Sequence, residues 1–199
     1  MGSVREPIKK TSIEKKRRII EKGFELMCDQ GYHNVTCVDI AKYADVSTGI
    51  IYQYFKEKHD IFIAGVKSYA SSIMYPMIKT LDQNNIDNIK YVVEQILEQF
   101  IKTHKMSKKA HEELMAMSHI DSEVSQIFKN NEMEISNKIV NCLNSNGFKI
   151  NKINEKVHII VGLIDNFCHE TIYHQHDQLD YDYMKNEIVS IILNLLKGV

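Results

Sequence analysis

Residues that interrupt helices are nearly absent from most of this chain. Only two of its 199 residues are proline, Pro7 and Pro76, and no glycine occurs between Gly65 and Gly147. Turns and strands are usually marked by these two residue types, so their scarcity predicts long helices. Apolar residues recur at intervals of three and four, and no comparable stretch alternates with a period of two. We therefore predict an all-α fold.

The expected helices follow from this periodicity and from capping residues. Pro76 is expected to kink or end the helix that begins at residue 58. Polar stretches at 82–85 and 144–147 are expected to form loops. A possible capping pair, Thr11 and Glu14, is expected at the start of the first helix. The predicted helices cover about residues 12–30, 37–44, 47–54, 58–76, 87–104, 108–118, 122–144, 154–175 and 182–197.

Composition excludes several classes of protein. The chain is 44% hydrophobic and 26% charged with a net charge of −1, which excludes a disordered chain and binding of nucleic acid through bulk positive charge. No apolar run approaches the roughly 18 residues of a membrane span, and the start does not read as a secretory leader. We expect a cytoplasmic protein without a membrane-inserted part.

The cysteines and histidines do not form a recognisable metal motif. The four cysteines lack a C-x-x-C pair, and His174 and His176 have no other ligands at zinc-like spacing. We therefore expect no metal and no cofactor. The cysteines are interpreted as small buried residues, with a redox-sensing thiol as the alternative.

Charge is distributed unevenly along the chain. Residues 1–22 contain eight Lys or Arg and three Glu, a net charge of 8 − 3 = +5, whereas residues 61–199 contain fourteen basic and seventeen acidic residues, 14 − 17 = −3. The basic start is either a solvated terminus or an arm that binds phosphate.

Two short helices joined by a tight turn are predicted between residues 36 and 55. Thr36 lies three residues before Asp39, which is the spacing of a capping box, and Ser47 is a good N-cap for the second helix. Asp45 in the turn tolerates left-handed backbone geometry. This arrangement is a helix-turn-helix, in which small or polar residues at the start of the second helix meet DNA bases.

At these residues the chain resembles the TetR family of transcriptional regulators. Residues 46–58, VSTGIIYQYFKEK, are similar to the family pattern V-S-x-G-x-[LI]-Y-x-[HY]-F-x-x-K, and Thr36-x-x-x-Ile40-Ala41 matches the preceding helix. The resemblance covers residues 12–61. The chain departs from the pattern at Asp45, where the family usually has glycine, and at Ile50, where a small residue is common.

The residues and the resemblance together give a predicted DNA-binding set. Hydroxyl groups and free backbone N–H groups at helix starts suit phosphate, and Gly49 permits close approach to the groove. Thr48, Ile50 and Gln53 are predicted to read bases, since glutamine pairs with adenine. The resemblance implies that Tyr52, Tyr54 and Lys58 contact the DNA backbone, while the alternative for both tyrosines is a place in the core. The predicted set is Thr36, Ser47, Thr48, Gly49, Ile50, Tyr52, Gln53, Tyr54 and Lys58.

The remainder of the chain is expected to bind an effector and to dimerise. We predict a DNA-binding domain over residues 1–57, comprising three helices and the basic arm, and a helical effector-binding and dimerisation domain over 58–199. Helices 154–175 and 182–197 are apolar on more than one face, which suits either a single monomer core or the homodimer interface that the resemblance implies.

The resemblance also implies a ligand pocket in the middle region, for a small, largely apolar effector. Methionine and aromatic residues there suit an adaptable cavity, although plain core is the alternative for most of them. The candidate ligand residues are Tyr69, Phe100, His104, His111, Met115, His119, Asp165 and His169.

These features favour a transcriptional regulator over an enzyme. The chain lacks a nucleophile motif, a zinc-protease motif and a glycine-rich phosphate loop, so we expect no enzyme activity. The expected function is a homodimeric repressor that a small effector releases from a palindromic operator by moving helix 58–75. The alternative is a DNA-binding or interaction protein with this fold and no effector.

Overall fold

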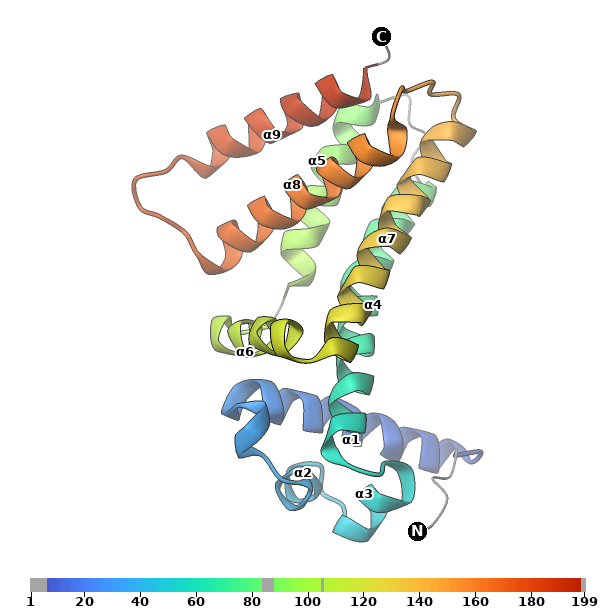
Figure 1. Ribbon diagram of the computed structural model, residues 1–199, viewed down its shortest axis with the longest axis vertical. Coiled ribbons are helices and arrows are strands. Elements are labelled where there is room, and N and C mark those ends of the chain that lie inside the picture. The colour runs from blue at the N-terminus through green and yellow to red at the C-terminus, as the bar shows by residue number, and fades with distance from the viewer. Residues whose placement is uncertain (1–6, 84–87, 105, 198–199) are drawn as a thin grey trace. The chain divides into compact units, whose positions relative to one another are not determined.

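A computed structural model describes residues 7–83, 88–104 and 106–197 (Figure 1). Over these ranges the chain forms nine α-helices and one short 3-10 helix, without a strand, which confirms the all-α prediction. The residues divide into two compact units, each with its own core: residues 1–70 with 106–128, and residues 71–105 with 129–199. The predicted functional division between residues 57 and 58 stays a prediction, because these units are defined by packing.

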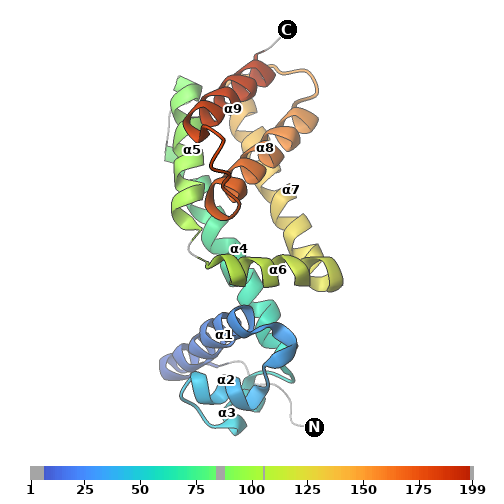
Figure 2. The ribbon, with the colours of Figure 1, turned by 90° about the vertical axis from the view of Figure 1, so that its left-hand side faces the viewer.

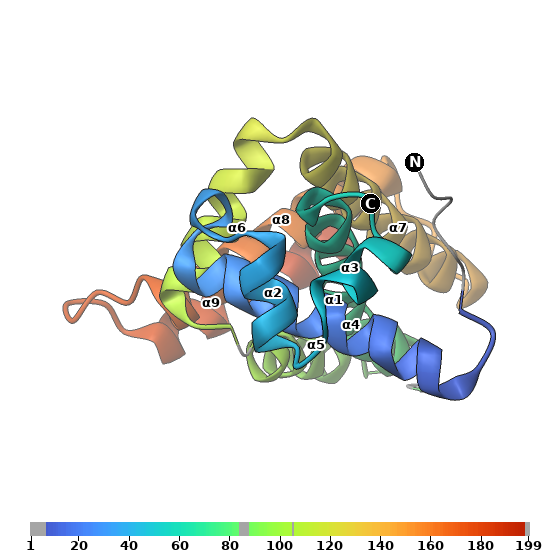
Figure 3. The same cartoon turned by 90° about the horizontal axis from the view of Figure 1, so that it is seen from below.

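The first unit contains the N-terminal helices together with a helix from the middle of the chain. Two longer helices, α4 and α7, begin in this unit and continue past its limits. Figure 3 shows α1, α2 and α3 grouped together. The elements are α1 (Lys10–Gln30), η1 (Tyr32–Asn34), α2 (Cys37–Tyr43), α3 (Thr48–Tyr54), α4 (Lys58–Gln83), α6 (Lys108–Ile120) and α7 (Ser122–Ser145).

Two glycines allow the helices of this unit to pack closely. A Cβ added at Gly23 of α1 would lie 2.7 Å from Ile61 Cγ2 of α4 and 3.1 Å from Ile40 Cγ2 of α2. A Cβ at Gly65 of α4 would collide with the ring of Phe24. Three helices therefore meet at Gly23, and Ile40 and Ile61 are fully buried there. Close packing of this kind leaves little freedom in the positions of these helices.

The second unit is built from the remaining helices together with the later parts of α4 and α7. Its core is almost entirely aliphatic and includes Leu97, Val157 and Ile192, all fully buried. Figure 2 shows α5, α8 and α9 side by side, as their mutual contacts require. Their bounds are α5 (Ile89–Thr103), α8 (Ile153–Tyr173) and α9 (Tyr181–Leu196).

Most predicted helix limits agree with the structure, and three local predictions were wrong. The pair Thr11 and Glu14 forms no capping box, because α1 already begins at Lys10 and its N-cap, Lys9, makes no side-chain cap bond. Of the kink or end expected at Pro76, an end is wrong, because α4 continues to Gln83. The first two residues of the loop predicted at 82–85 therefore belong to α4, and its last two residues lie outside the described ranges. No helix within the described ranges is long and apolar enough to cross a membrane.

Candidate nucleic-acid interface

The start of α2 is fixed by the predicted capping box. The Asp39 N–H donates to Thr36 Oγ1 at 3.3 Å, and the Thr36 N–H and hydroxyl donate to Asp39 Oδ2 at 2.9 and 2.6 Å. Hydrogen bonds from the hydroxyl and backbone of Thr36 hold the pKa of Asp39 below its ordinary value. Both residues are exposed, so the N-terminus of α2 is ordered and open to solvent.

The turn between α2 and α3 has the geometry expected from its sequence. Asp45 has a φ of 52°, in the left-handed region, and the Val46 N–H donates to Ala41 O at 2.9 Å. The guanidinium of Arg18 in α1 donates to the Asp45 carbonyl at 3.0 Å. A contact from a separate helix thus supports the turn that sets the direction of α3.

Helix α3 has one buried and one exposed face. Ile51 and the C-cap Phe55 are buried against α1 and α2 core residues, whereas Tyr52 is 55% exposed. Ser47 occupies the N-cap position, but its side chain makes no cap bond. Because residues three and four apart share a helix face, Thr48, Gly49, Tyr52 and Gln53 form one outer surface.

Gly49 has no structural need to be glycine. A Cβ added there would meet only Ser47 Oγ, at 3.9 Å, and the backbone is helical. Glycine within a helix costs about 0.5–1 kcal/mol relative to alanine. The fold therefore gives no reason for this residue, whereas close approach of an external partner to the α3 backbone does.

Besides Thr36 in its capping box, other members of the predicted DNA-binding set are engaged within the protein. Tyr54 is only 5% exposed and lies in the core, the alternative considered from the sequence. Ile50 is half-buried and packs partly against the same core. The ammonium of Lys58 donates to Tyr32 O at 2.7 Å and to Val35 O at 2.8 Å, and it lies 4.5 Å from the centre of the Tyr32 ring.

Several basic residues of the N-terminal segment also have intramolecular partners. Arg17 pairs with Glu21 at 3.4 Å and Lys22 with Glu25 at 2.8 Å. Lys16 lies 5.8 Å from the centre of the Phe55 ring. Since residues 1–6 lie outside the described ranges, the phosphate-binding arm stays a prediction.

The eight predicted ligand residues divide between the two units. Tyr69, His111, Met115 and His119 belong to the first unit, where His111 is buried while Met115 and His119 are exposed. The other four belong to the second unit and come together there.

In the second unit these residues form an aromatic cluster. The ring of His104 stacks on that of Phe100, with 4.2 Å between the ring centres. It meets the ring of His169 edge-on, with 5.0 Å between the centres. His169 Nδ1 lies 3.2 Å from Asp165 Oδ2, the predicted contact between residues four apart. Burial lowers the pKa of His104, and its Nδ1 lies 2.9 Å from Phe100 O. Sequence reasoning missed Tyr173, whose ring stacks on His169 at 6.1 Å.

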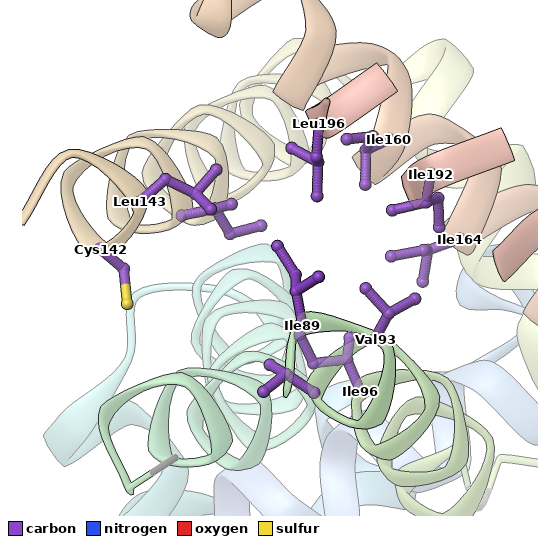
Figure 4. Close-up of a pocket in the computed structure, with 11 residues that line it drawn as sticks. Ile89, Val93, Ile96, Cys142, Leu143, Ile160, Ile164, Ile192 and Leu196 are labelled. Atoms are coloured by element: carbon purple, nitrogen blue, oxygen red, sulfur yellow. The ribbon is translucent and has the colours of Figure 1, made fainter. Parts of the chain in front are cut away.

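A small apolar cavity lies elsewhere in the second unit (Figure 4). Its volume is about 40 Å³, and none of the predicted ligand residues lines it. The sequence signal was the apolar periodicity of α5 and α8, which did not reveal which side chains would leave space between them. The lining residues are Ile89, Val92, Val93, Ile96, Ile139, Cys142, Leu143, Ile160, Ile164, Ile192 and Leu196.

No arrangement of three or more His, Cys, Asp or Glu within the described ranges is suited to hold a metal ion. Burial raises the pKa of both Cys28 and Cys168 to about 12, so these thiols stay protonated at neutral pH. A protonated, buried thiol is a poor nucleophile.

The first unit therefore has the architecture of a helix-turn-helix DNA-binding domain, with a supported turn and an exposed second-helix face. Residues 19–64 match the family model described as bacterial regulatory proteins, tetR family. Over these residues the N-terminal domain is similar to that of the tetR family.

Comparison with curated relatives concerns mainly this domain. The chain is 44% identical over 55 residues to the HTH-type transcriptional regulator HbdR of Aromatoleum sp. (strain CIB), covering 28% of this chain and 24% of that protein. It is 45% identical over 47 residues to the fatty acid metabolism regulator protein of Bacillus subtilis (strain 168), covering 24% of each chain. The matched region thus spans about a quarter of the length of these relatives.

Solved structures resemble the chain over most of its length. A TetR-family transcriptional regulator from Mesorhizobium loti has a TM-score of 0.75 at 16% identity, covering 94% of this chain and 98% of that one. A transcriptional regulator from Saccharomonospora viridis in complex with choline has a TM-score of 0.70 at 18% identity, covering 91% and 96%. These likenesses show a shared fold.

The contacts of Lys58 lead to a stability prediction. Replacing Lys58 with methionine keeps most of the aliphatic chain but removes the donor from two part-buried carbonyls, so we expect the free energy of unfolding to fall by about 1–3 kcal/mol. Urea unfolding followed by circular dichroism measures this change. The control is Lys56→Met, an exposed position two residues away, with an expected change within about 0.5 kcal/mol. Equal stability of the two variants would contradict the assignment.

Proposed function

We propose that this chain is a sequence-specific DNA-binding transcriptional regulator, acting as a repressor on a palindromic operator. The observation that carries the proposal is the outer face of α3, where Gly49 and Tyr52 are exposed and Thr48 and Gln53 are half-buried. This face lies in a helix-turn-helix whose residues match the tetR family model. Small and polar residues here suit contact with the DNA major groove.

The proposed DNA contacts fall into two groups. Thr36, Ser47 and Tyr52 bind phosphate through hydroxyl groups and through backbone N–H groups at helix starts. Thr48 and Gln53, with the edge of Ile50, read bases. Tyr54 and Lys58 are engaged within the protein, as described above. A phosphate contact by either side chain would have to be shared with those contacts or replace them.

Selection of random duplex DNA by the purified protein tests this function. We expect enrichment of an inverted repeat and a linear fall of log affinity with log salt concentration. Absence of an enriched sequence from protein freed of bound small molecules would contradict the proposal.

Two substitutions separate phosphate binding from base reading. Tyr52→Phe removes one hydroxyl and is expected to weaken binding to all duplexes alike, by about threefold to tenfold, since a hydrogen bond contributes about 0.5–1.5 kcal/mol. Gln53→Ala is expected to change the preferred base at one position of each half-site, where discrimination is worth about 1–3 kcal/mol. Competition between the selected duplex and its single-base variants measures both effects. A uniform loss from both substitutions would contradict this division of roles.

We further propose a homodimer formed through α8 and α9. Both helices expose large apolar side chains in spite of their buried faces: Ile159 on α8, and on α9 Tyr183, which is 63% exposed, and Ile191, which is 44% exposed. Gly162 on α8 also has open space around its Cα. Two copies double the number of phosphate contacts, which compensates for the few free cations of one copy, and a two-fold dimer matches a palindromic operator.

A charged residue within this surface is expected to separate the subunits. Ile191→Asp places a carboxylate in an apolar interface and should give a monomer at micromolar concentration, with unchanged helix content. Sedimentation velocity together with circular dichroism tests this expectation. Ile120→Asp is the matched control, because Ile120 is 70% exposed on α6, a helix of the first unit. A monomeric wild-type protein, or a dimeric Ile191→Asp variant, would argue against the proposed interface.

The proposed effector is small and largely apolar, and binds in the second unit. Support comes from the cavity among α5, α7, α8 and α9, whose lining side chains are all apolar. A quaternary ammonium such as the choline of the Saccharomonospora relative would find no carboxylate in this lining, so an uncharged aliphatic group is the better fit. Since the cavity measures only about 40 Å³, a larger effector must displace its walls.

Filling the cavity is expected to weaken the effector response without loss of DNA binding. Ile164→Phe adds volume at a buried lining residue, so an apolar compound that releases the wild-type protein from DNA should release the variant only at a concentration more than about tenfold higher. Fluorescence anisotropy of a labelled operator, titrated with aliphatic compounds and with choline, provides the measurement. Met133→Phe, at an exposed position of α7, is the control. If every compound leaves DNA affinity unchanged, the alternative of an effector-independent DNA-binding protein is favoured.

A further inference from the structure

The connection between α1 and α2, residues 31–36, determines where α2 begins. The chain turns at Gly31, where φ is 94°, and passes through η1 to Thr36, the N-cap of α2. Thr36 is also a proposed phosphate contact. Packing at Gly23 holds the body of α2, and the connection governs the conformation of its N-terminus at Thr36.

Two side chains of opposite charge hold Tyr32 in this connection. The Tyr32 N–H donates to Glu113 Oε1 at 2.7 Å, and the Tyr32 carbonyl accepts from Lys58 Nζ at 2.7 Å. The Tyr32 ring also meets Phe62 at 5.0 Å. Both backbone polar groups of Tyr32 therefore bind charged partners, and such charge-assisted bonds are stronger than those between neutral groups.

Glu113 comes from α6, which is far from the connection in sequence but belongs to the same unit. Ala110, Leu114 and Met117 of α6 are buried in the core that includes α1 and α2 residues. The buried face of α6 therefore fixes the carboxylate of Glu113 close to Gly31, where an added Cβ would lie 3.9 Å from Oε1.

A second carboxylate fixes the other end of α6. Asp121 Oδ2 lies 2.8 Å from His59 Nε2 at the start of α4, and Asp121 Oδ1 accepts from the N–H groups of Glu123 and Val124. Burial alone would raise the pKa of Asp121, but hydrogen bonds from Val124 and His59 hold it below its ordinary value. This charged carboxylate ties the α6–α7 corner to the same helix that supplies Lys58.

We propose that Glu113 is a positioning residue for DNA binding. Through the Tyr32 N–H it holds the α1–α2 connection in the conformation that presents Thr36 and the start of α2 to phosphate. The inference rests on the proposed function, and it assigns to α6 a direct part in shaping the DNA-binding surface.

Three variants test this role on the selected duplex. Glu113→Ala removes the acceptor, so we expect affinity to fall about tenfold with an unchanged salt slope, because no phosphate contact is lost directly. Glu113→Gln retains an acceptor oxygen and should restore affinity to within about threefold of wild type. The control, Glu112→Ala, makes the same change of charge at the exposed neighbouring position and should not weaken binding. Unchanged affinity in Glu113→Ala would overturn the inference, as would an equal loss in all three variants.

Hydrogen exchange gives a readout that does not require DNA. In the protein alone, Glu113→Ala should accelerate amide exchange over residues 31–41 by about tenfold, while the core of the second unit keeps its protection. Glu113→Gln should keep most of this protection. Unchanged exchange over 31–41 in Glu113→Ala would overturn the inference. Failure of the wild-type protein to select any duplex would instead overturn the proposed function, so the two failures are distinguishable.

Discussion

The first unit depends on the close packing of α1, α2 and α4 at Gly23. With only a hydrogen in place of a side chain, Gly23 allows Ile40 and Ile61 to meet over the backbone of α1. A larger residue would force these two buried side chains apart, and with them the beginnings of the helix-turn-helix and of α4. Gly65 plays the same part further along α4, where the ring of Phe24 packs directly against the α4 backbone. The spacing of these helices is thus set by the absence of a side chain at two glycines, Gly23 and Gly65, rather than by polar contacts.

Around this core, charged side chains act mainly between segments of the protein. Arg18 supports the turn at Asp45, Lys58 and Glu113 hold Tyr32, and Asp121 joins His59. The cations that a phosphate would attract are therefore partly committed inside the unit. Beside Lys42, the outer surface of α2 and α3 carries hydroxyl groups, an amide and backbone N–H groups. This division agrees with a net charge of −1.

Local features of the fold were predictable, and contacts distant in sequence were not. The Thr36–Asp39 capping box and the left-handed Asp45 depend on neighbours within a few residues, so the sequence contained the information. The partners of Lys58 lie 26 and 23 residues away, and Glu113 lies 81 residues from Tyr32. The aromatic cluster was found in part because Asp165 and His169 share a helix face, whereas the cavity depends on packing among four helices.

Helices α2 and α3 have seven residues each, too few to persist as helices outside a folded protein. Both helices are stable only because they pack on the core of the first unit. They are therefore expected to unfold together with that core rather than separately. A molecule of this protein that has lost part of that core has no recognition surface left, and it exposes Ile40 and Ile51 to proteases and chaperones. Under the proposed function, such a molecule would lose DNA binding altogether rather than bind DNA in a half-folded form.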